Sequence, residues 1–211
     1  MNFRYRITYT KTESMRYTGN LDVHKAWERT FRRAKLPLAY SQGFHPQPKI
    51  QLACPLPLGF LSENEILDFY TTEEVSVESI VKLLKGKMPD GLVILEIKLI
   101  LENEPALSVQ TIATRYRIEF LDDVDESSLS IGLNRLMNQV SLFRKRRGKE
   151  YDLRPLIKEI ELGNKDNKPI LYLILSALQG ATGRPDEVLL ELNFNSAAAR
   201  ITREKTFLSA N

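Results

Sequence analysis

The 211-residue sequence has one cysteine, Cys54, and only two histidines, His24 and His45. A single thiol excludes an internal disulfide and the zinc and iron–sulfur sites that need several cysteines. Two histidines are too few for a histidine-rich metal site, so we expect neither a metal nor another cofactor. Cys54 stands in an apolar run, where a buried and inert thiol is the expected form.

Long hydrophobic runs are also missing. No window reaches the roughly 18 to 20 consecutive apolar residues that cross a bilayer, and the closest is the interrupted run from Leu92 to Leu101. The first 14 residues alternate apolar and polar side chains, unlike the apolar core of a signal peptide. With 43% hydrophobic and 27% charged residues, the composition is that of a folded globular protein. We expect a cytoplasmic protein that does not insert into membranes.

Acidic residues are scarce in the first quarter of the chain. Residues 1–50 hold ten lysines or arginines against three acids, a charge of +7, although the whole chain carries only +3. Positive charge gathered in one region is the electrostatic footprint of a protein that binds a polyanion such as nucleic acid.

The first half predicts the element order βαββαβ, because strand-like alternation and helix-like spacing of apolar residues take turns. In the first helix, Val23, Trp27, Phe31 and Ala34 form the apolar face, and Asn20 is the expected N-cap. The predicted strands are 3–11, 49–58, 65–73 and 91–101, and the predicted helices are 19–35 and 75–87.

The second half repeats this order. The predicted strands are 111–121, 152–162, 169–178 and 199–208, and the predicted helices are 126–143, with Leu129, Leu133, Leu136 and Val140 on one face, and 184–192. Together the halves predict an α+β fold of two tandem ferredoxin-like (βαββαβ) units with antiparallel sheets. We expect an N-terminal unit at 1–103 and a C-terminal unit at 104–211.

The solvent side of the first helix is basic. Only Glu28 stands at the right spacing to pair with its cations, and arginine suits bidentate contact with phosphate. A solvated charged face fits the pattern equally well. The candidate binding residues are Lys25, Arg29, Arg32 and Arg33.

The loop YSQGFHPQPK, residues 40–49, follows this helix and joins aromatic, amide and basic groups that stack on unpaired bases and bond their edges. Its prolines stiffen it, which reduces the entropy lost on binding. A connection packed on its own aromatics is the structural alternative. The candidate residues are Tyr40, Ser41, Phe44, His45 and Lys49.

A second basic connection, RKRRGK at 144–149, follows the first helix of the second half. Such runs are commonly just solvated turns. If the two units pack in related orientations, this run and the 40–49 loop are expected to line one positive groove. The candidate residues here are Arg144, Lys145, Arg146 and Arg147.

Several short motifs fall between residues 16 and 68: Leu-Asp at 21–22, the arginine-rich helix, Leu-Pro-x-x-Tyr-Ser-x-Gly-Phe at 36–44 and Pro-Leu-Gly at 57–59. This segment resembles the radical-SAM-linked domain of unknown function, a bacterial family found fused to, or encoded beside, radical S-adenosylmethionine proteins. The resemblance implies an accessory partner of a radical enzyme. The chain itself lacks the three-cysteine cluster motif of such an enzyme.

These observations lead to one main hypothesis and two alternatives. The main hypothesis is a non-catalytic module that binds structured RNA, such as tRNA or rRNA, and works with a separately encoded radical-SAM enzyme. The first alternative is a metal-independent ribonuclease in which His45 is the general acid or base, although no nucleophile is evident beside it. The second is a protein-interaction adaptor whose basic helix docks on a radical-SAM partner.

Overall fold

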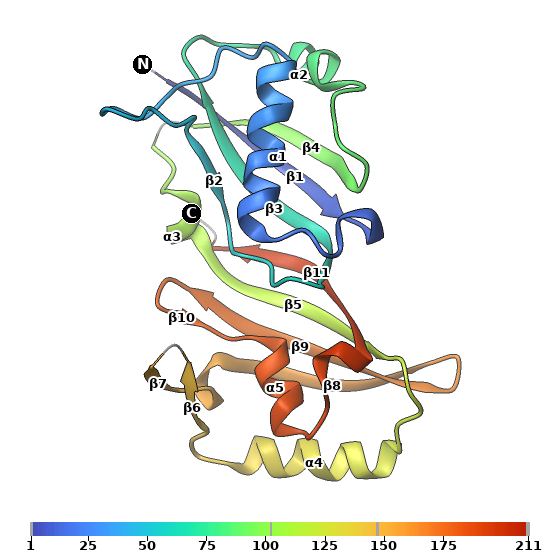
Figure 1. The fold of residues 1–211 in the computed structure, drawn as a ribbon. Coiled ribbons are helices and arrows are strands. Elements are labelled where there is room, and N and C mark those ends of the chain that lie inside the picture. The colour runs from blue at the N-terminus through green and yellow to red at the C-terminus, as the bar shows by residue number, and fades with distance from the viewer. Residues whose placement is uncertain (1, 102, 147, 210–211) are drawn as a thin grey trace. The chain divides into compact units, whose positions relative to one another are not determined.

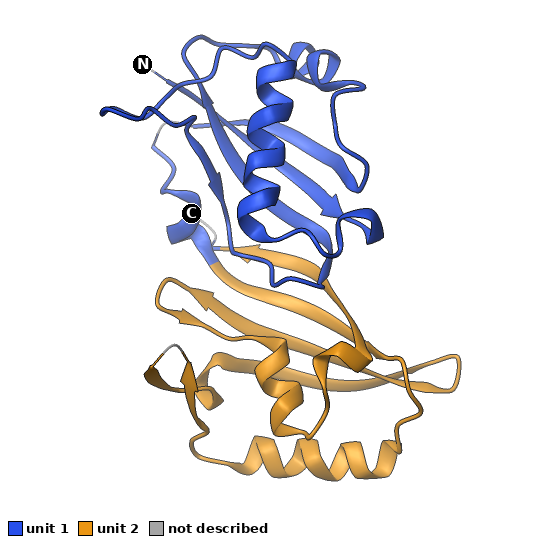
Figure 2. Ribbon diagram, viewed as in Figure 1, with its two compact units in different colours: residues 1–111, 209–211 blue, residues 112–208 orange. Residues whose placement is uncertain are grey.

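The computed structural model describes residues 2–101, 103–146 and 148–209. The chain has a mixed α/β architecture with mostly antiparallel strand pairing, and it divides into two compact units. Unit 1 comprises residues 1–111 with 209–211, and unit 2 comprises residues 112–208 (Figure 2). Residues 104–111 therefore lie in the first unit.

Unit 1 has the predicted order of elements (Figure 1). Its sheet has the strand order β2-β3-β1-β4, in which β3 is antiparallel to β1 and β2, and β4 is antiparallel to β1. A short helix, α3, follows the sheet. The elements are β1 (Phe3–Lys11), α1 (Asn20–Arg33), β2 (Ile50–Leu52), β3 (Leu61–Thr71), α2 (Val77–Leu84), β4 (Leu92–Ile100) and α3 (Leu107–Gln110).

Alternation along β1 divides the two faces of this sheet. Tyr5, Ile7 and Tyr9 are buried in the core with the apolar face of α1. There the ring of Tyr9 meets Trp27 edge-on, with 4.9 Å between the ring centroids. Gly19, not Asn20, is the N-cap of α1, and no side chain caps the helix there, so the expected Asn20 cap is wrong.

The other face of β1 carries Arg4 and Arg6, which are buried with Asp68 of β3. Arg4 Nε donates to Asp68 Oδ2 at 2.6 Å, and Arg6 Nε donates to Asp68 Oδ1 at 2.7 Å. Arg6 lies opposite Asp68 in the strand register, so one carboxylate joins the two arginines across the pair. We call these three residues the arginine cluster.

Residues 104–110 close over the arginine cluster. Arg4 Nη1 donates to the carbonyl oxygens of Glu104 at 3.0 Å and Pro105 at 2.8 Å. Arg6 Nη2 donates to Gln110 Oε1 at 2.6 Å, and Gln110 in turn donates to the Glu104 carboxylate at 3.1 Å. Buried charges need such partners, since an unpaired one is strongly destabilising.

Unit 2 pairs β9 antiparallel to β5, β8 and β10, while β11 flanks β5 in the strand order. A separate two-stranded hairpin, β6–β7, follows α4. Leu129, Leu133 and Leu136 form the buried face of α4. The elements are β5 (Thr111–Phe120), α4 (Glu126–Asn138), β6 (Phe143–Arg146), β7 (Lys149–Asp152), β8 (Ile157–Lys165), β9 (Lys168–Leu178), β10 (Ala181–Thr182), α5 (Pro185–Glu191) and β11 (Ala199–Leu208).

The predicted elements depart most from the structure at three places. The strand expected at 49–58 is paired only over Ile50–Leu52, since the prolines that follow lack the N–H that a ladder needs. The helix expected at 126–143 ends at Asn138, and Val140 is 96% exposed instead of buried. The strand expected at 152–162 begins only at Ile157, after a short 3-10 helix that contains Pro155.

Within the described residues, no helix has both the length and the apolar character needed to cross a membrane. The same part of the chain holds no group of three or more histidine, cysteine, aspartate or glutamate side chains placed to bind a metal ion.

Asp68→Asn is expected to lower the free energy of unfolding by about 3–5 kcal/mol, because it leaves two buried guanidinium groups facing a neutral side chain. Urea denaturation measures this change. Glu96→Gln on the exposed face of β4 is the matched control, since its 4.0 Å pair with Lys98 is exposed on both sides and is expected to contribute less than about 1 kcal/mol. A similar loss in both variants would contradict a special role for Asp68.

Asp125→Ala is expected to lower the thermal midpoint of unfolding at neutral pH. Asp125 caps α4, and the hydroxyl and backbone N–H of Ser128, which donate to its carboxylate, lower its pKa from the ordinary 3.8. A lowered carboxylate pKa gives stability that is full above the unfolded-state value and is lost as the pH falls through the folded-state value.

The midpoint difference between wild type and Asp125→Ala should therefore shrink in acid, at about pH 2.5. Calorimetry at neutral and acid pH measures it. Asp123→Ala serves as the control because the Asp123 side chain is fully exposed. A pH-independent difference would show that the charged cap is not its origin.

Candidate functional site

Residues 40–48 form a hairpin whose base is fixed to the end of β3; we call it the 40–48 hairpin. The N–H of Ala39 donates to the carbonyl of Tyr70 at 2.8 Å, and the N–H of Tyr70 donates to the carbonyl of Lys49 at 3.1 Å. Lys49 also donates from its backbone to Ala39 at 2.8 Å. The loop is thus held at both ends, and Figure 1 shows it reaching out beyond the sheet.

Ser41 shapes the hairpin from inside. Its backbone N–H donates to Gln47 O at 2.8 Å, and its hydroxyl accepts from the Gln47 N–H at 3.0 Å. Gly43 has φ = 123°, a conformation that side chains with a Cβ rarely adopt. Ser41 therefore has a structural role in the loop, whatever else it contacts.

The aromatic side chains of the hairpin lie in solvent. Phe44 is completely exposed, Tyr40 is 40% exposed, and His45 is also exposed. In the part of the chain that the structure describes, the side chains of Tyr40 and His45 have no hydrogen bond or ion pair. The alternative of a loop packed on its own aromatics does not describe Phe44.

The basic residues of α1 divide into two kinds. Arg32 pairs with Glu28 at 2.8 Å, and Arg33 donates to the carbonyl of Lys87 at 2.6 Å. Lys25 and Arg29 are exposed, and among the described residues neither side chain has a polar partner. These two cations are available to an external anion without breaking an internal contact.

The helix and the hairpin meet at one end of the sheet. The chain turns after α1 at Lys35, which has φ = 55°. Leu38 then forms an isolated antiparallel β-bridge with Thr71 at the end of β3. Thr71 lies opposite Phe3, where β1 begins. The C-terminal end of α1, the hairpin base and the start of β1 therefore share this end of unit 1.

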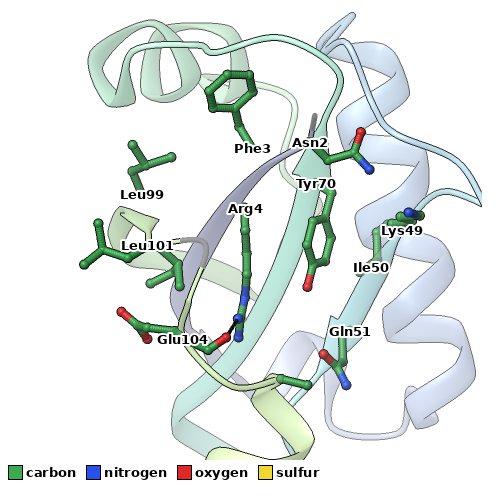
Figure 3. Close-up of a pocket in the computed structure, with 12 residues that line it drawn as sticks. Asn2, Phe3, Arg4, Lys49, Ile50, Gln51, Tyr70, Leu99, Leu101 and Glu104 are labelled. Atoms are coloured by element: carbon green, nitrogen blue, oxygen red, sulfur yellow. Dashed lines mark hydrogen bonds between the residues drawn. The ribbon is translucent and has the colours of Figure 1, made fainter. Parts of the chain in front are cut away.

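A cavity of about 720 Å³ opens at the same end. Figure 3 shows part of its lining: Lys49, Ile50 and Gln51 of the β2 segment lie across from Leu99, Leu101 and Glu104, with Arg4 and Tyr70 between them. Lys49 thus belongs both to the predicted loop and to this cavity. Arg4, Gln51 and Tyr70 are lining residues that sequence reasoning missed.

A signal for part of this site was present in the sequence. The strand FRYRITYTK places Arg4 and Arg6 on one face, while Tyr5, Ile7 and Tyr9 occupy the other. Two arginines on one face of a strand with an apolar opposite face indicate either an exposed basic strip or a buried ion cluster. The cavity itself also depends on Glu104 and Ala106, and the position of this segment beside Arg4 has no local signal in the sequence.

The predicted basic residues of unit 2 lie on the β6–β7 hairpin. Arg144 forms an ion pair with Glu191 of α5, whereas Lys145 and Arg146 are exposed. Burial raises the pKa of nearby Tyr151 above its ordinary value, and the charge of Glu187 acts in the same direction. Arg147 lies outside the described residues. These residues belong to unit 2, whereas the 40–48 hairpin belongs to unit 1.

The sequence matches the model of a family described as "Uncharacterized protein conserved in bacteria (DUF2344)" over residues 4–185. None of the curated proteins matches the chain.

Among solved structures, a chain in the crystal structure of a Cbf5–Nop10–Gar1 complex is similar with a TM-score of 0.52 and 9% identity, over 98% of this chain and 50% of that chain. A chain of the archaeal box H/ACA Nop10–Cbf5 complex is similar with a TM-score of 0.46 and 10% identity, over 98% of this chain and 49% of that chain. A chain of an H/ACA ribonucleoprotein bound to a substrate RNA containing 2'-deoxyuridine is similar with a TM-score of 0.46 and 8% identity, over 96% of this chain and 49% of that chain.

This chain spans about half the length of the chains that it resembles. At 9% identity, the first likeness describes the fold alone.

Phe44→Ala is expected to change the free energy of unfolding by less than about 0.5 kcal/mol, because a fully exposed ring loses no packing when it is removed. Phe31→Ala, which empties a fully buried position in α1, should cost about 3–5 kcal/mol. Urea denaturation of both variants checks the contrast. A large loss in Phe44→Ala would mean that the ring has a structural role.

Proposed function

The chain belongs to the DUF2344 family of proteins conserved in bacteria, and we propose that it is a non-catalytic RNA-binding module that assists a radical-SAM enzyme. It would bind a structured RNA such as tRNA or rRNA, and it would take part in the modification of that RNA or in ribosome-related RNA metabolism. We further propose that each unit is ferredoxin-like. The βαββαβ order of unit 1 and its β2-β3-β1-β4 sheet support that description.

The observation that carries the proposal is the exposed ring of Phe44 on a hairpin fixed at both ends. An exposed phenyl ring gains nothing for folding, whereas a base that stacks on it removes apolar surface from water. Because the hairpin is already ordered, less entropy is lost on binding than with a flexible loop. Tyr40 and His45 offer further faces and edges for unpaired bases.

Exposed cations of α1 and of the loop itself supply the second requirement. Lys25 and Arg29 have no internal partner among the described residues, and Lys49 ends the aromatic loop. Contacts with phosphate position a nucleic acid without reading its sequence. Aromatic stacking together with phosphate contact is the pattern of proteins that bind unpaired segments of RNA.

The proposal of a non-catalytic role rests on the surroundings of His45. A histidine that acts as a general base is commonly oriented by a hydrogen bond to a second side chain. Within the described residues, no side chain forms a hydrogen bond or ion pair with His45. The radical-SAM partnership rests on the resemblance of residues 16–68 to the radical-SAM-linked domain, and the proposed cytoplasmic location rests on the composition of the sequence.

Binding of labelled tRNA and rRNA fragments to the purified chain, followed by fluorescence anisotropy over a salt series, tests the proposal. Affinity should fall as salt rises, because each phosphate contact releases counterions. Phe44→Ala should weaken binding by about 5- to 150-fold, the loss of one stacked base. Arg29→Ala should weaken binding across sequences and reduce the salt dependence. Lys82→Ala, an exposed lysine of α2, is the matched control and should change neither.

Three outcomes would contradict the proposal. The first is the absence of salt-dependent binding. The second is RNA that is recovered shortened, with cleavage that persists in chelator and is lost in His45→Ala; this would establish a ribonuclease. The third is a radical-SAM protein that co-purifies from nuclease-treated lysate with a chain that binds no RNA; this would establish the adaptor.

A further inference from the structure

The cavity beside Lys49 combines an apolar wall with hydrogen-bonding groups. Leu99 and Leu101 lie on one side and Gln51 on the other, with Tyr70 between them (Figure 3). Ile100 also lines the cavity. Its volume of about 720 Å³ falls within the usual range of small-molecule sites. Polar and charged side chains thus lie across from an apolar side, which suits a ligand that has both a flat ring and polar groups.

Two of these polar groups have unused bonding capacity. Gln51 donates from Nε2 to Ser108 Oγ at 3.0 Å, which fixes the amide and leaves its carbonyl oxygen as an acceptor. The Tyr70 hydroxyl has no hydrogen bond among the described residues, although the Tyr70 backbone anchors Lys49. A hydroxyl and an amide oxygen in fixed positions can bond both donors and acceptors on the edge of a ligand.

The charge beside the cavity is positive. Arg4 lines it, and the arginine cluster to which Arg4 belongs has two cations against one carboxylate. Lys49 adds an ammonium group without a polar partner in the described part of the chain. The Glu104 carboxylate offsets part of this charge, but it accepts a hydrogen bond from Gln110. An anionic group is therefore best placed at the Lys49 side.

We propose that this cavity binds one nucleotide, with the base against Ile100, which lies opposite Arg4 in the strand register, and Leu101, and with the phosphate at Lys49. Tyr70 and Gln51 would bond the edge of the base. The inference deepens the proposed function, because the nucleotide would be an unpaired residue of the bound RNA. A free nucleotide has the same chemistry and is distinguished by the experiment. Lys49 ends the aromatic loop and lines the cavity, so a strand stacked on Phe44 has a continuous route into it.

Titration of the ¹⁵N-labelled protein with UMP, CMP, AMP, GMP, uridine and inorganic phosphate, followed by NMR, tests this site. We expect saturable shifts at residues 49–51, Tyr70 and 99–101 with nucleotides, and at least 5-fold weaker binding of uridine than of UMP. Lys49→Ala should weaken UMP at least 5-fold and leave uridine nearly unchanged. RNA should displace the nucleotide.

Leu101→Glu blocks the cavity with a carboxylate at a position that is 68% exposed and so tolerates the change. Leu58→Glu, at 63% exposure outside the cavity, is the control. We expect Leu101→Glu to abolish nucleotide shifts and to weaken RNA binding at least 10-fold, with no effect of the control. Tyr70→Phe should weaken nucleotide binding without loss of folding.

The outcomes separate this inference from the proposed function. RNA binding without nucleotide shifts, and unchanged in Leu101→Glu, would overturn the cavity and leave the RNA-binding proposal intact. Saturable nucleotide binding in a chain that binds no RNA would support the cavity as a site for a free nucleotide and overturn the RNA-binding proposal. Shifts caused equally by phosphate alone would overturn the assignment of a base to the apolar wall.

Discussion

Unit 1 depends on a single buried carboxylate. Asp68 is fully buried between Arg4 and Arg6, so the two central strands must keep the register that brings these side chains together. The spare donors of the arginines bind residues 104–110, which forces the chain after β4 back across the sheet. The arginine cluster thereby joins β1 to β3. It also holds residues 104–110 over its own face of the sheet, and its Arg4 lines the cavity.

In the 40–48 hairpin the backbone is ordered by hydrogen bonds, while the aromatic side chains stay exposed. The 40–48 hairpin takes its hydrogen bonds from β3 and from itself, so its aromatic side chains are not needed for packing. The prolines at 46 and 48 restrict the backbone further. Rigid backbone and free side chains are the combination that a binding loop needs, since the ordering entropy is spent during folding. Lys49 connects this loop to the cavity, which makes the two sites one continuous candidate surface.

Periodicity predicted the elements wherever one face of a strand or helix is buried. The bounds of β1 follow the alternation of Phe3–Lys11, and the buried face of α1 contains the predicted Val23, Trp27 and Phe31. Predictions failed where apolar residues do not mark burial. Val140 continues the spacing of α4 but is exposed, and the leucines after β2 lie among prolines that cannot extend the ladder. The sequence did not predict the arginine cluster, because arginines in a strand are usually exposed. Only the pairing of β1 with β3 brings Asp68 next to Arg4 and Arg6.

The sequence by itself determined the local features: the order of elements in unit 1, the basic solvent side of α1, and a loop of aromatic and amide groups after it. These depend on residues that are near one another in the chain, so spacing and residue type are sufficient. Only the tertiary structure decided that Arg33 binds the distant carbonyl of Lys87, whereas Lys25 and Arg29 have no polar partner among the described residues. It also decided that residues 49–51 and Tyr70 line a cavity together with 99–101, Glu104 and Ala106. Such contacts join residues up to a hundred positions apart, and their pairing is set by strand register and packing, which no local pattern encodes.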